Sequence, residues 1–257
     1  MKTITIILNW NNPDDTILVA DEVLLNQKAS VLIIDNNSSD NSLSIIKQHY
    51  KNSLPNIGWK LLSDFSITIN ENEPSVYLLS LDKNYGFAGG INKAIRKIKS
   101  DIFKYIWLLN NDAIPNANAL ALLEEHLGNN QNLAFAGSLI ADYFDRTKVQ
   151  CAGVTYYPIL GISKLVLKNE LINSISDSLI KQQKIDFQHG SSLLVATKYL
   201  PEIGLLDEDF FLYFEEQDWQ YRAKKAGYGN ELVAESIVFH KGSMSTENSK
   251  YLFFYYS

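Results

Sequence analysis

The sequence contains little cysteine, little proline and no excess of positive charge. Its single cysteine, Cys151, excludes a disulfide within the chain and suits a reducing compartment. With 6 prolines and 13 glycines, the chain is neither collagen-like nor a proline-rich array. Its 23 Lys and Arg against 29 Asp and Glu give a net charge of −6. Proteins that bind nucleic acid without sequence preference need cationic surface, so we expect no nucleic-acid partner.

Long apolar runs are absent as well. No window approaches the roughly 18 apolar residues that a membrane-spanning helix requires. The N-terminal apolar stretch is too short for the core of a signal peptide, and no small-residue cleavage site follows it. Apolar residues nevertheless make up 46% of the chain, enough to form a core and to exclude a disordered protein. We therefore expect a folded, cytoplasmic protein.

The first half of the chain repeats one pattern, in which an apolar strand is followed by a polar loop and an amphipathic helix. We predict strands at 3–8, 31–34, 76–79 and 105–109, followed by loops at 9–13, 35–40, 82–90 and 110–115. Such repeats favour a parallel sheet with helices on both faces. Ligands of these sheets bind outside the carboxyl ends of the strands, so Asp35 and Asp112 are expected near one cleft.

The remaining segments are less regular. Residues 51–74 are predicted to form a long connection that can hold one hairpin, and residues 133–170 a mixed sheet or flap. Asn118 is the predicted cap of the helix that follows the fourth loop.

Two residues at predicted strand ends have side chains that can bind a metal. Asp112 follows the strand at 105–109, where a free carboxylate suits a hard divalent cation; it could instead form a turn before Pro115. His240 ends the apolar run 237–239 and could fill a coordination site or be a surface or capping residue. The other histidines, His189 among them, have no stronger case.

Six carboxylates crowd residues 207–218, around a mostly aromatic run. Glu215, Glu216 and Asp218 follow this run directly. A charge run is usually a solvated face. Neighbouring carboxylates can also raise one another's pKa, which is how a general base can arise.

Glycines at 86, 89 and 90 precede a predicted helix and allow the backbone to approach a ligand closely. Their spacing matches neither the Walker A loop nor the dinucleotide-binding fingerprint. Trp10 could stack on a base, although a Trp at a strand end is more often part of the core.

Six ordered motifs together resemble the family-2 glycosyltransferases with a GT-A fold, most closely the rhamnosyltransferase-like bacterial branch. They are Asn-Trp-Asn-Asn at 9–12, Asp-Asn-Asn-Ser-Ser-Asp at 35–40, Asn-Tyr-Gly-Phe-Ala-Gly-Gly-Ile-Asn at 84–92, Leu-Asn-Asn-Asp at 109–112, Phe-Glu-Glu-Gln-Asp-Trp-Gln-Tyr-Arg at 214–222, and His240. The resemblance extends from about residue 3 to 246. It implies an α/β fold with a Rossmann-like, mostly parallel sheet flanked by helices, and a smaller mixed sheet on the acceptor side.

The resemblance also implies a role for each motif residue. Asp112 and His240 would bind Mn²⁺ or Mg²⁺, Glu216 stands at the position of the catalytic base, and Asp218 would lie near the acceptor. Two departures matter: Asn110 replaces a metal-binding Asp, and Glu replaces Asp at 216, so Glu215 and Asp218 compete for the role of base. The implied donor-binding residues are Asn9, Trp10, Asn11, Asp35, Asn37, Asn84, Gly86, Gly89, Asn92, Asn110 and Asn111.

The function implied is inverting transfer of a sugar from a dTDP- or UDP-linked donor to a hydroxyl of a glycan or lipid-linked acceptor, in polysaccharide synthesis at the inner membrane face. Residues 1–128 would bind the nucleotide-sugar, and 129–257 the acceptor, within one continuous domain. The aromatic segment 250–257 could contact a membrane or a partner. Two alternatives are a nucleotidyltransferase, although residues 9–15 lack the Lys or Arg that would hold a triphosphate, and an inactive nucleotide-sugar-binding module.

Overall fold

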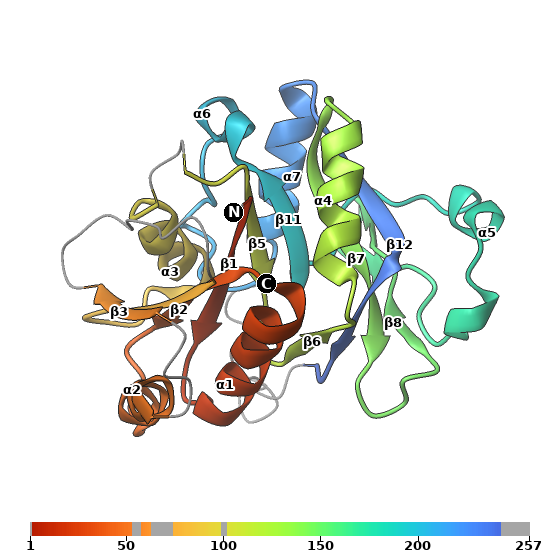
Figure 1. Cartoon of the computed structure of the whole chain (residues 1–257). Coiled ribbons are helices and arrows are strands. Elements are labelled where there is room, and N and C mark those ends of the chain that lie inside the picture. The colour runs from red at the N-terminus through yellow and green to blue at the C-terminus, as the bar shows by residue number, and fades with distance from the viewer. Residues whose placement is uncertain (1, 53–57, 63–73, 99–101, 243–257) are drawn as a thin grey trace.

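The computed structural model describes residues 2–52, 58–62, 74–98 and 102–242, and within them ten strands form one twisted sheet (Figure 1). In spatial order these are β3 (Gly58–Leu62), β4 (Ser75–Ser80), β2 (Ser30–Asp35), β1 (Thr3–Asn9), β5 (Tyr105–Leu109), β11 (Ser192–Ala196), β7 (Leu133–Asp142), β12 (Gly229–His240) and β6 (Ala113–Pro115), with β8 (Val149–Cys151) paired to β7. Strands β3, β4, β2, β1 and β5 all run parallel. The four predicted loops therefore share one edge of the sheet, which confirms the expectation drawn from the strand–loop repeat.

Helices cover both faces of this sheet. The main ones are α1 (Pro13–Glu22), α2 (Ser42–Asn52), α3 (Gly86–Ile95), α4 (Ala119–Asn129) and α7 (Glu215–Lys225), with short α5 (Asp177–Lys181) and α6 (Leu200–Ile203). Successive residues of a strand point to opposite faces. On β1, Asn9 accepts a hydrogen bond from Thr16 of α1, whereas its neighbour Leu8 packs against Gly90 of α3. A Cβ at Gly90 would lie 2.5 Å from Leu8 Cδ1, so the glycine lets α3 lie close to the sheet.

Strand β11 joins the two halves of the chain, because it pairs antiparallel with both β5 and β7. One hydrophobic core runs through both halves. On β7, Phe135 packs edge-on against Trp219 of α7, with ring centroids 5.2 Å apart. Ser138, which points to the other face, bonds to Ser236, and that residue donates to the Ala119 carbonyl at the start of α4. Helices α4 and α7 therefore cover opposite faces of the same strands.

The predicted mixed sheet of the second half is present. Strands β7 and β8 extend the large sheet, while β9 (Val154–Tyr157) and β10 (Ile162–Leu165) form a separate antiparallel hairpin. The prediction of a long connection over 51–74 is wrong in one part: 58–62 is a strand parallel to β4, so it is not half of a hairpin with that strand. Residues 53–57 and 63–73, and the aromatic segment 250–257, lie outside the described residues.

The structure also places Asn118 and Cys151. Asn118 precedes α4 as predicted, but its side chain makes no capping hydrogen bond. Cys151 is fully buried, and burial raises its pKa to about 11, so it behaves as a core residue.

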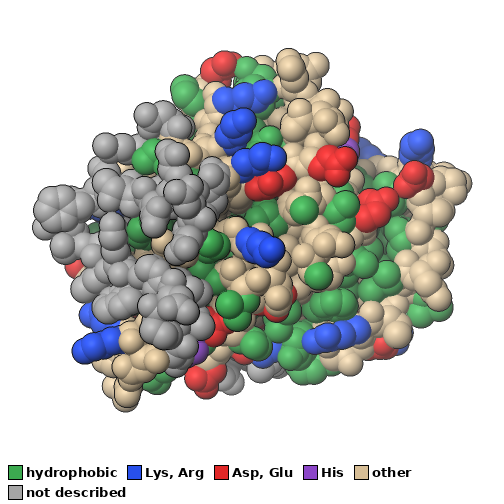
Figure 2. Space-filling model, in the orientation of Figure 1, with side chains coloured by type: hydrophobic (Ala, Val, Ile, Leu, Met, Phe, Trp, Pro, Cys, Tyr) green, Lys and Arg blue, Asp and Glu red, His purple; other side chains and the backbone are tan. Residues whose placement is uncertain are grey.

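On the coloured part of the face shown in Figure 2, acidic and basic side chains are interspersed. None of the helices in the described ranges is both long enough and apolar enough to span a bilayer.

Candidate active site

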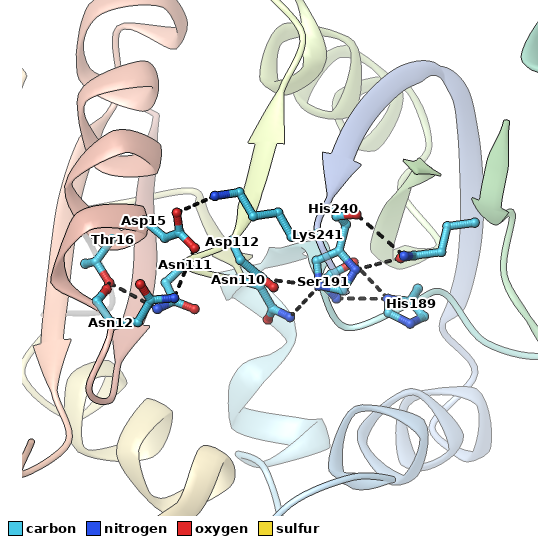
Figure 3. Close-up of polar contacts among 11 residues, drawn as sticks. Asn12, Asp15, Thr16, Asn110, Asn111, Asp112, His189, Ser191, His240 and Lys241 are labelled. Atoms are coloured by element: carbon cyan, nitrogen blue, oxygen red, sulfur yellow. Dashed lines mark hydrogen bonds and ion pairs between the residues drawn. The ribbon is translucent and has the colours of Figure 1, made fainter. Parts of the chain in front are cut away.

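Asp112 and His240 meet at the edge where the parallel strands end (Figure 3). Asp112 lies between β5 and β6, and His240 is the last residue of β12. The antiparallel pairing of β12 with β6 places His240 opposite Ala113, and the Lys241 N–H donates to the Asp112 carbonyl over 3.1 Å. As a result, His240 Nε2 lies 3.2 Å from Asp112 Oδ1. Both residues are only 8% exposed.

The hydrogen bonds around His240 determine which ring nitrogen carries the proton and which presents a lone pair to Asp112. Nδ1 donates to Gln150 Oε1 over 2.6 Å, because an amide oxygen can only accept. In the neutral imidazole, Nε2 is then the acceptor, and the Asn110 amide nitrogen approaches it at 3.4 Å. An imidazole lone pair and a carboxylate oxygen that face each other in a buried place are the donor set that binds a divalent cation.

No group of three metal-ligating His, Cys, Asp or Glu side chains occurs within the described ranges. Asp112 and His240 would therefore supply two ligands, and the other coordination positions would fall to ligand oxygens and water. This composition fits Mn²⁺ or Mg²⁺ bound together with a phosphate-bearing ligand.

The start of α1 contacts Asn111 and Lys241, the neighbours of Asp112 and His240 in the chain (Figure 3). Lys241 forms an ion pair with Asp15, and Asn12 donates to the other oxygen of that carboxylate over 3.1 Å. Asn111 donates to the Thr16 hydroxyl over 3.1 Å. The loops that follow β1, β5 and β12 are thus tied into one unit, although each comes from a different part of the chain.

Asp35 and Asn9 sit side by side at the ends of β2 and β1, as their parallel register requires. Both are buried. The Asn9 amide donates to Asp35 Oδ1 over 2.9 Å and to the Ser38 hydroxyl over 3.1 Å, and Ser38 donates to the same Asp35 oxygen over 2.6 Å. Asn9 therefore fixes the orientation of the Asp35 carboxylate. Trp10, by contrast, is 38% exposed, so its ring is open to stack on a ligand.

Asn11 and Asn37 shape the loops around Asp35. Both adopt left-handed backbone conformations, with φ of 54° and 58°, which Asn tolerates better than most residues. Asn11 accepts a hydrogen bond from the Ser39 N–H over 2.8 Å, while Asn37 is exposed. The structure thus gives Asn11 a role in holding the two loops together and leaves the Asn37 side chain open to solvent.

The space next to Gly86 is occupied by the chain itself, and contact of Gly86 with the donor stays a prediction. Gly86 has φ of +70°, and a Cβ there would overlap the Phe211 carbonyl oxygen. The Phe87 N–H donates to the same oxygen over 2.8 Å. Asn84 accepts from the Gly86 N–H over 2.8 Å and from the buried Asn36 amide over 2.9 Å. These contacts fix the start of α3 against Phe211, which lies just before residues 213–218, called the acidic turn below.

Asn92 and Gly89 likewise contact the protein. Asn92 is 1% exposed; its amide donates to the Leu206 carbonyl and to Glu208, and its oxygen accepts from the Leu206 N–H. Asn92 therefore positions residues 206–208, and its place beside the donor stays a prediction. A Cβ at Gly89 would lie 2.9 Å from Tyr85 Cβ, within the first turn of α3.

The acidic turn begins with a strained backbone. Tyr213 and Phe214 both have left-handed φ values, 72° and 67°, and α7 starts at the next residue, Glu215. Left-handed backbone costs roughly 1–2 kcal/mol for an ordinary L-residue. Strain of this kind persists where the surrounding structure holds it, and it concentrates at functional sites. Here it points Glu215 into the protein, where its side chain is 5% exposed.

Glu215 and Glu216 differ in environment. Glu215 Oε2 is buried and has no hydrogen-bond partner in the described part of the chain. Burial, together with the charge of Glu216, raises its pKa well above the usual range. Glu216 is half-buried, and burial raises its pKa too. The third candidate, Asp218, accepts from Arg222 Nε over 2.7 Å and forms an ion pair with it.

His189 and Gly190 lie between the start of α7 and the Asp112–His240 pair. The His189 ring centroid lies 6.0 Å from that of His240, and a Cβ on the adjoining Gly190 would lie 3.1 Å from Glu216 Cγ. The Ser191 N–H donates to His189 Nδ1 over 3.2 Å, so Nε2 carries the proton of the neutral ring. Burial, and then the charge of His240, lowers the pKa of His189 to about 4. The His189 ring thus lies next to His240, and the adjoining Gly190 lies next to Glu216.

The sequence model of Glycosyl transferase family 2 matches residues 5–200. The chain belongs to this family. The predicted GT-A-type fold is confirmed by its sheet and by the solved structures that it resembles. The matched range contains the ends of β1, β2 and β5 and the loop with His189, whereas Glu216 and His240 lie beyond it.

Three similar proteins share little sequence identity with this family-2 glycosyltransferase. The low-salt glycan biosynthesis hexosyltransferase Agl10 of Haloferax volcanii is 22% identical over 152 residues, covering 58% of this chain and 47% of that protein. The mannosyltransferase PcManGT from Pyrobaculum calidifontis, solved with GDP-Man and Mn²⁺, has a TM-score of 0.64 at 12% identity, covering 95% of this chain and 57% of that one. GalNAc-T7, solved with UDP, GalNAc and Mn²⁺, has a TM-score of 0.68 at 13% identity, covering 93% and 44%. The chain thus spans about half the length of these relatives.

Sequence reasoning missed several residues of the site. His189 was set aside, yet it lies between His240 and Glu216. Gln150 and Asn36 were not singled out, although they orient His240 and the start of α3. The sequence pattern that could have indicated His189 is the pair His189-Gly190, a polar residue and a glycine just before an apolar strand. Gln150 gave no signal, because a polar residue in a short strand is ordinary.

Proposed function

We propose that this family-2 glycosyltransferase is an inverting, metal-dependent enzyme that moves a sugar from a dTDP- or UDP-linked donor to a hydroxyl of a glycan or lipid-linked acceptor. The observation that supports the proposal is the buried Asp112–His240 pair, which His189 and Gly190 link to Glu216, a carboxylate whose pKa is raised. Transfer of a sugar from a nucleoside diphosphate needs two functions. A cation held by Asp112 and His240 would offset charge on the leaving phosphates, and Glu216 would take a proton from the acceptor hydroxyl.

Asp112 and His240 would hold the divalent cation, Mn²⁺ or Mg²⁺. When bound, such an ion acts as a Lewis acid that stabilises the charge that develops on a departing diphosphate. The chain's own contribution is orientation. Gln150 fixes the His240 ring through Nδ1, and the backbone bond from Lys241 to Asp112 fixes the two residues relative to each other. With Asn110 in place of a second carboxylate, this site carries less negative charge, so affinity would depend strongly on the donor's phosphates.

Asp35 would select the base of the donor. Its carboxylate is anchored on one oxygen by Asn9 and Ser38, and it lies at the same edge of the sheet as Asp112. A fixed carboxylate acceptor suits the N3–H of a uracil or thymine ring. The exposed Trp10 ring, next to Asn9, would stack on the base or ribose.

Glu216 would be the catalytic base. A base must reach the acceptor hydroxyl and be deprotonated in part of the population, and a raised pKa increases its proton affinity. Glu216 is half-exposed and packs over Gly190, whereas Glu215 is buried and Asp218 is paired with Arg222. Attack by the activated hydroxyl, opposite the leaving diphosphate, forms the new glycosidic bond as the old bond to the phosphate oxygen breaks. A single displacement of this kind inverts the anomeric centre.

His189 would complete the acceptor side of the site. Its neutral ring offers an Nε2–H donor, because Nδ1 is occupied by the Ser191 N–H. A donor between the metal-binding pair and Glu216 suits a sugar hydroxyl. The rhamnosyltransferase-like branch and the role in polysaccharide synthesis at the inner membrane face remain predictions from the sequence resemblance.

A titration and an activity screen test the proposal. We expect UDP or dTDP to bind with Mn²⁺ present and to bind much more weakly with EDTA, with GDP as the comparison base. We expect a screen of nucleotide-sugars to show slow donor hydrolysis for one donor class, and Glu216→Gln to remove it. Release of pyrophosphate from a nucleoside triphosphate would instead indicate a nucleotidyltransferase. Nucleotide binding without turnover of any donor would indicate an inactive binding module.

A further inference from the structure

The tip of the β9–β10 hairpin carries four exposed apolar side chains. Ile159 is 98% exposed and Leu160 67%, and Tyr157 and Ile162 are about half exposed. All four lie at or beside the tip, where Tyr157 pairs with Ile162. Apolar side chains gathered in this way at a protruding tip are typical of surfaces that bind a partner or a membrane.

A backbone hydrogen bond closes the tip. The Leu160 N–H donates to the Tyr157 carbonyl over 3.1 Å, which closes a turn with Pro158 at its second position, and Gly161 follows with a left-handed φ of 63°. A Cβ at Gly161 would meet nothing within 4 Å. The exposed side chains are therefore presented by a closed turn, so little conformational entropy would be lost when they enter another phase.

The two faces of the hairpin differ. Tyr156 packs towards Phe187, and Ser163 donates to Gln217 of α7 over 2.9 Å, so one face is anchored to the body of the protein. The other face carries Tyr157, Ile162 and Lys164, since these residues alternate with the anchored ones. Lys164 is exposed. The apolar tip is thus flanked by a cation on its outward face.

The charge around the tip matches an anionic surface. The hairpin, residues 154–165, contains one lysine, the exposed Lys164, and no Asp or Glu, in a protein with a net charge of −6. On its anchored side, Asp186 accepts from the Tyr156 N–H over 2.9 Å and is paired with Lys184. A short apolar insertion flanked by a lysine suits a bilayer with anionic head groups, because apolar side chains enter the acyl boundary while the ammonium group remains at the head groups.

We propose that the β9–β10 hairpin docks this protein on an anionic lipid surface by inserting Ile159 and Leu160. The anchor on Gln217 places the hairpin beside Glu216, so docking would present the site to an acceptor carried in the same surface. This last step rests on the proposed function, whereas the docking itself does not.

Vesicle flotation tests the docking without any nucleotide-sugar, so its failure is distinct from failure of the proposed function. We expect the protein to bind vesicles of phosphatidylcholine with phosphatidylglycerol, and to bind phosphatidylcholine vesicles more weakly. Ile159→Ser with Leu160→Ser should weaken binding by about tenfold or more, given the apolar area that these side chains would bury. Leu25→Ser is the matched control: it removes another exposed leucine, far from the hairpin in sequence, and should leave binding unchanged.

Two further experiments identify which segment of the chain inserts into the bilayer. Ile159→Trp should shift its fluorescence to shorter wavelength on addition of anionic vesicles, and Leu25→Trp should not. Phe253→Ser with Phe254→Ser tests the membrane contact predicted for the aromatic segment 250–257. The proposal is wrong if the wild type binds no vesicles, if only the Phe253 and Phe254 changes release it, or if the hairpin changes convert an oligomer to a monomer without affecting vesicle binding.

Discussion

The side chains of Asp112 and His240 meet with 3.2 Å between Oδ1 and Nε2, although the two residues come from opposite halves of the chain. Their approach depends on the pairing of β6 with β12, which sets His240 against the residue that follows Asp112. Gln150, on β8, then turns the lone pair of Nε2 towards the carboxylate.

Gln150→Leu should lower the Mn²⁺-dependent affinity for UDP or dTDP by about 10–100-fold, the range found when a partner that orients a metal ligand is removed. The substitution leaves Asp112 and His240 in place but frees the imidazole to rotate or to change tautomer. Isothermal titration with and without EDTA measures the effect. Gln182→Leu, at an exposed position after α5, is the control. Equal affinity for wild type and Gln150→Leu would show that Gln150 does not orient His240.

Glu216→Gln should reduce sugar transfer by about 10²–10⁴-fold and leave donor binding nearly intact, because it removes the base without removing a metal ligand. Glu215→Gln should retain most activity, since the Glu215 side chain is buried. In the wild type, the rate should rise with pH through the raised pKa of Glu216, because the base acts in its deprotonated form. A matched loss in both variants would show that the two carboxylates act as one unit.

Glu215→Gln should stabilise the protein at neutral pH. Burial raises the pKa of Glu215 above its ordinary value of 4.5, so the folded state binds more protons than the unfolded state. Stability from this group is therefore complete below pH 4.5 and is lost as pH rises through the raised pKa. The variant's advantage in Tm should be absent at acid pH and grow towards neutrality, by about 2–4 °C for each kcal/mol.

Glu208→Gln should change the pH dependence of stability in the opposite direction to Glu215→Gln, so it serves as the comparison. Hydrogen bonds from Asn92 and the nearby Arg96 lower the pKa of Glu208, so its contribution to stability is present at neutral pH and is lost as pH falls. Thermal unfolding of both variants across a pH series separates the two effects. If Glu215→Gln lost Tm at neutral pH, the buried carboxylate would have a stabilising partner that the described structure does not contain.

Asp35→Ala should relax base selectivity, so that the ratio of affinities for UDP and GDP moves towards unity. Asn9→Ala should have a related but indirect effect, because it removes the amide that holds Asp35 and leaves the carboxylate buried with fewer partners. That loss should also cost about 1–3 kcal/mol of stability. Binding titrations with three nucleotides and denaturant unfolding measure the two effects. Unaltered selectivity in Asp35→Ala would exclude Asp35 from base recognition.

Gly86→Ala should destabilise the fold far more than Gly161→Ala, although both glycines have similar left-handed φ values. At Gly161 the added methyl group meets open space, so the cost is that of the backbone alone, roughly 1–2 kcal/mol. At Gly86 the methyl group overlaps the Phe211 carbonyl, which must move and release its bond to Phe87. Chemical denaturation of the two variants gives the comparison, and equal losses would show that the contact with Phe211 is dispensable.

The sequence alone determined the parallel half of the sheet and the loops at its edge. Apolar runs of four to six residues followed by Asn, Asp and Gly are local signals, and parallel strands bring their carboxyl ends together whatever the details of packing. Asp35, Asp112 and the turn after β1 could be placed at one edge on that basis. The ordered motifs then indicated the family.

Only the tertiary structure decided how the site is assembled. The contact of His240 with Asp112 depends on an antiparallel pairing between β6 and β12, which no local pattern encodes. The filling of the space above Gly86 by Phe211 is likewise a contact between distant segments. The burial of Glu215, with Glu216 half-exposed beside it, follows from two left-handed residues that end an aromatic run. Neighbouring carboxylates have the same chemistry in the sequence, and the path of the backbone separates their environments.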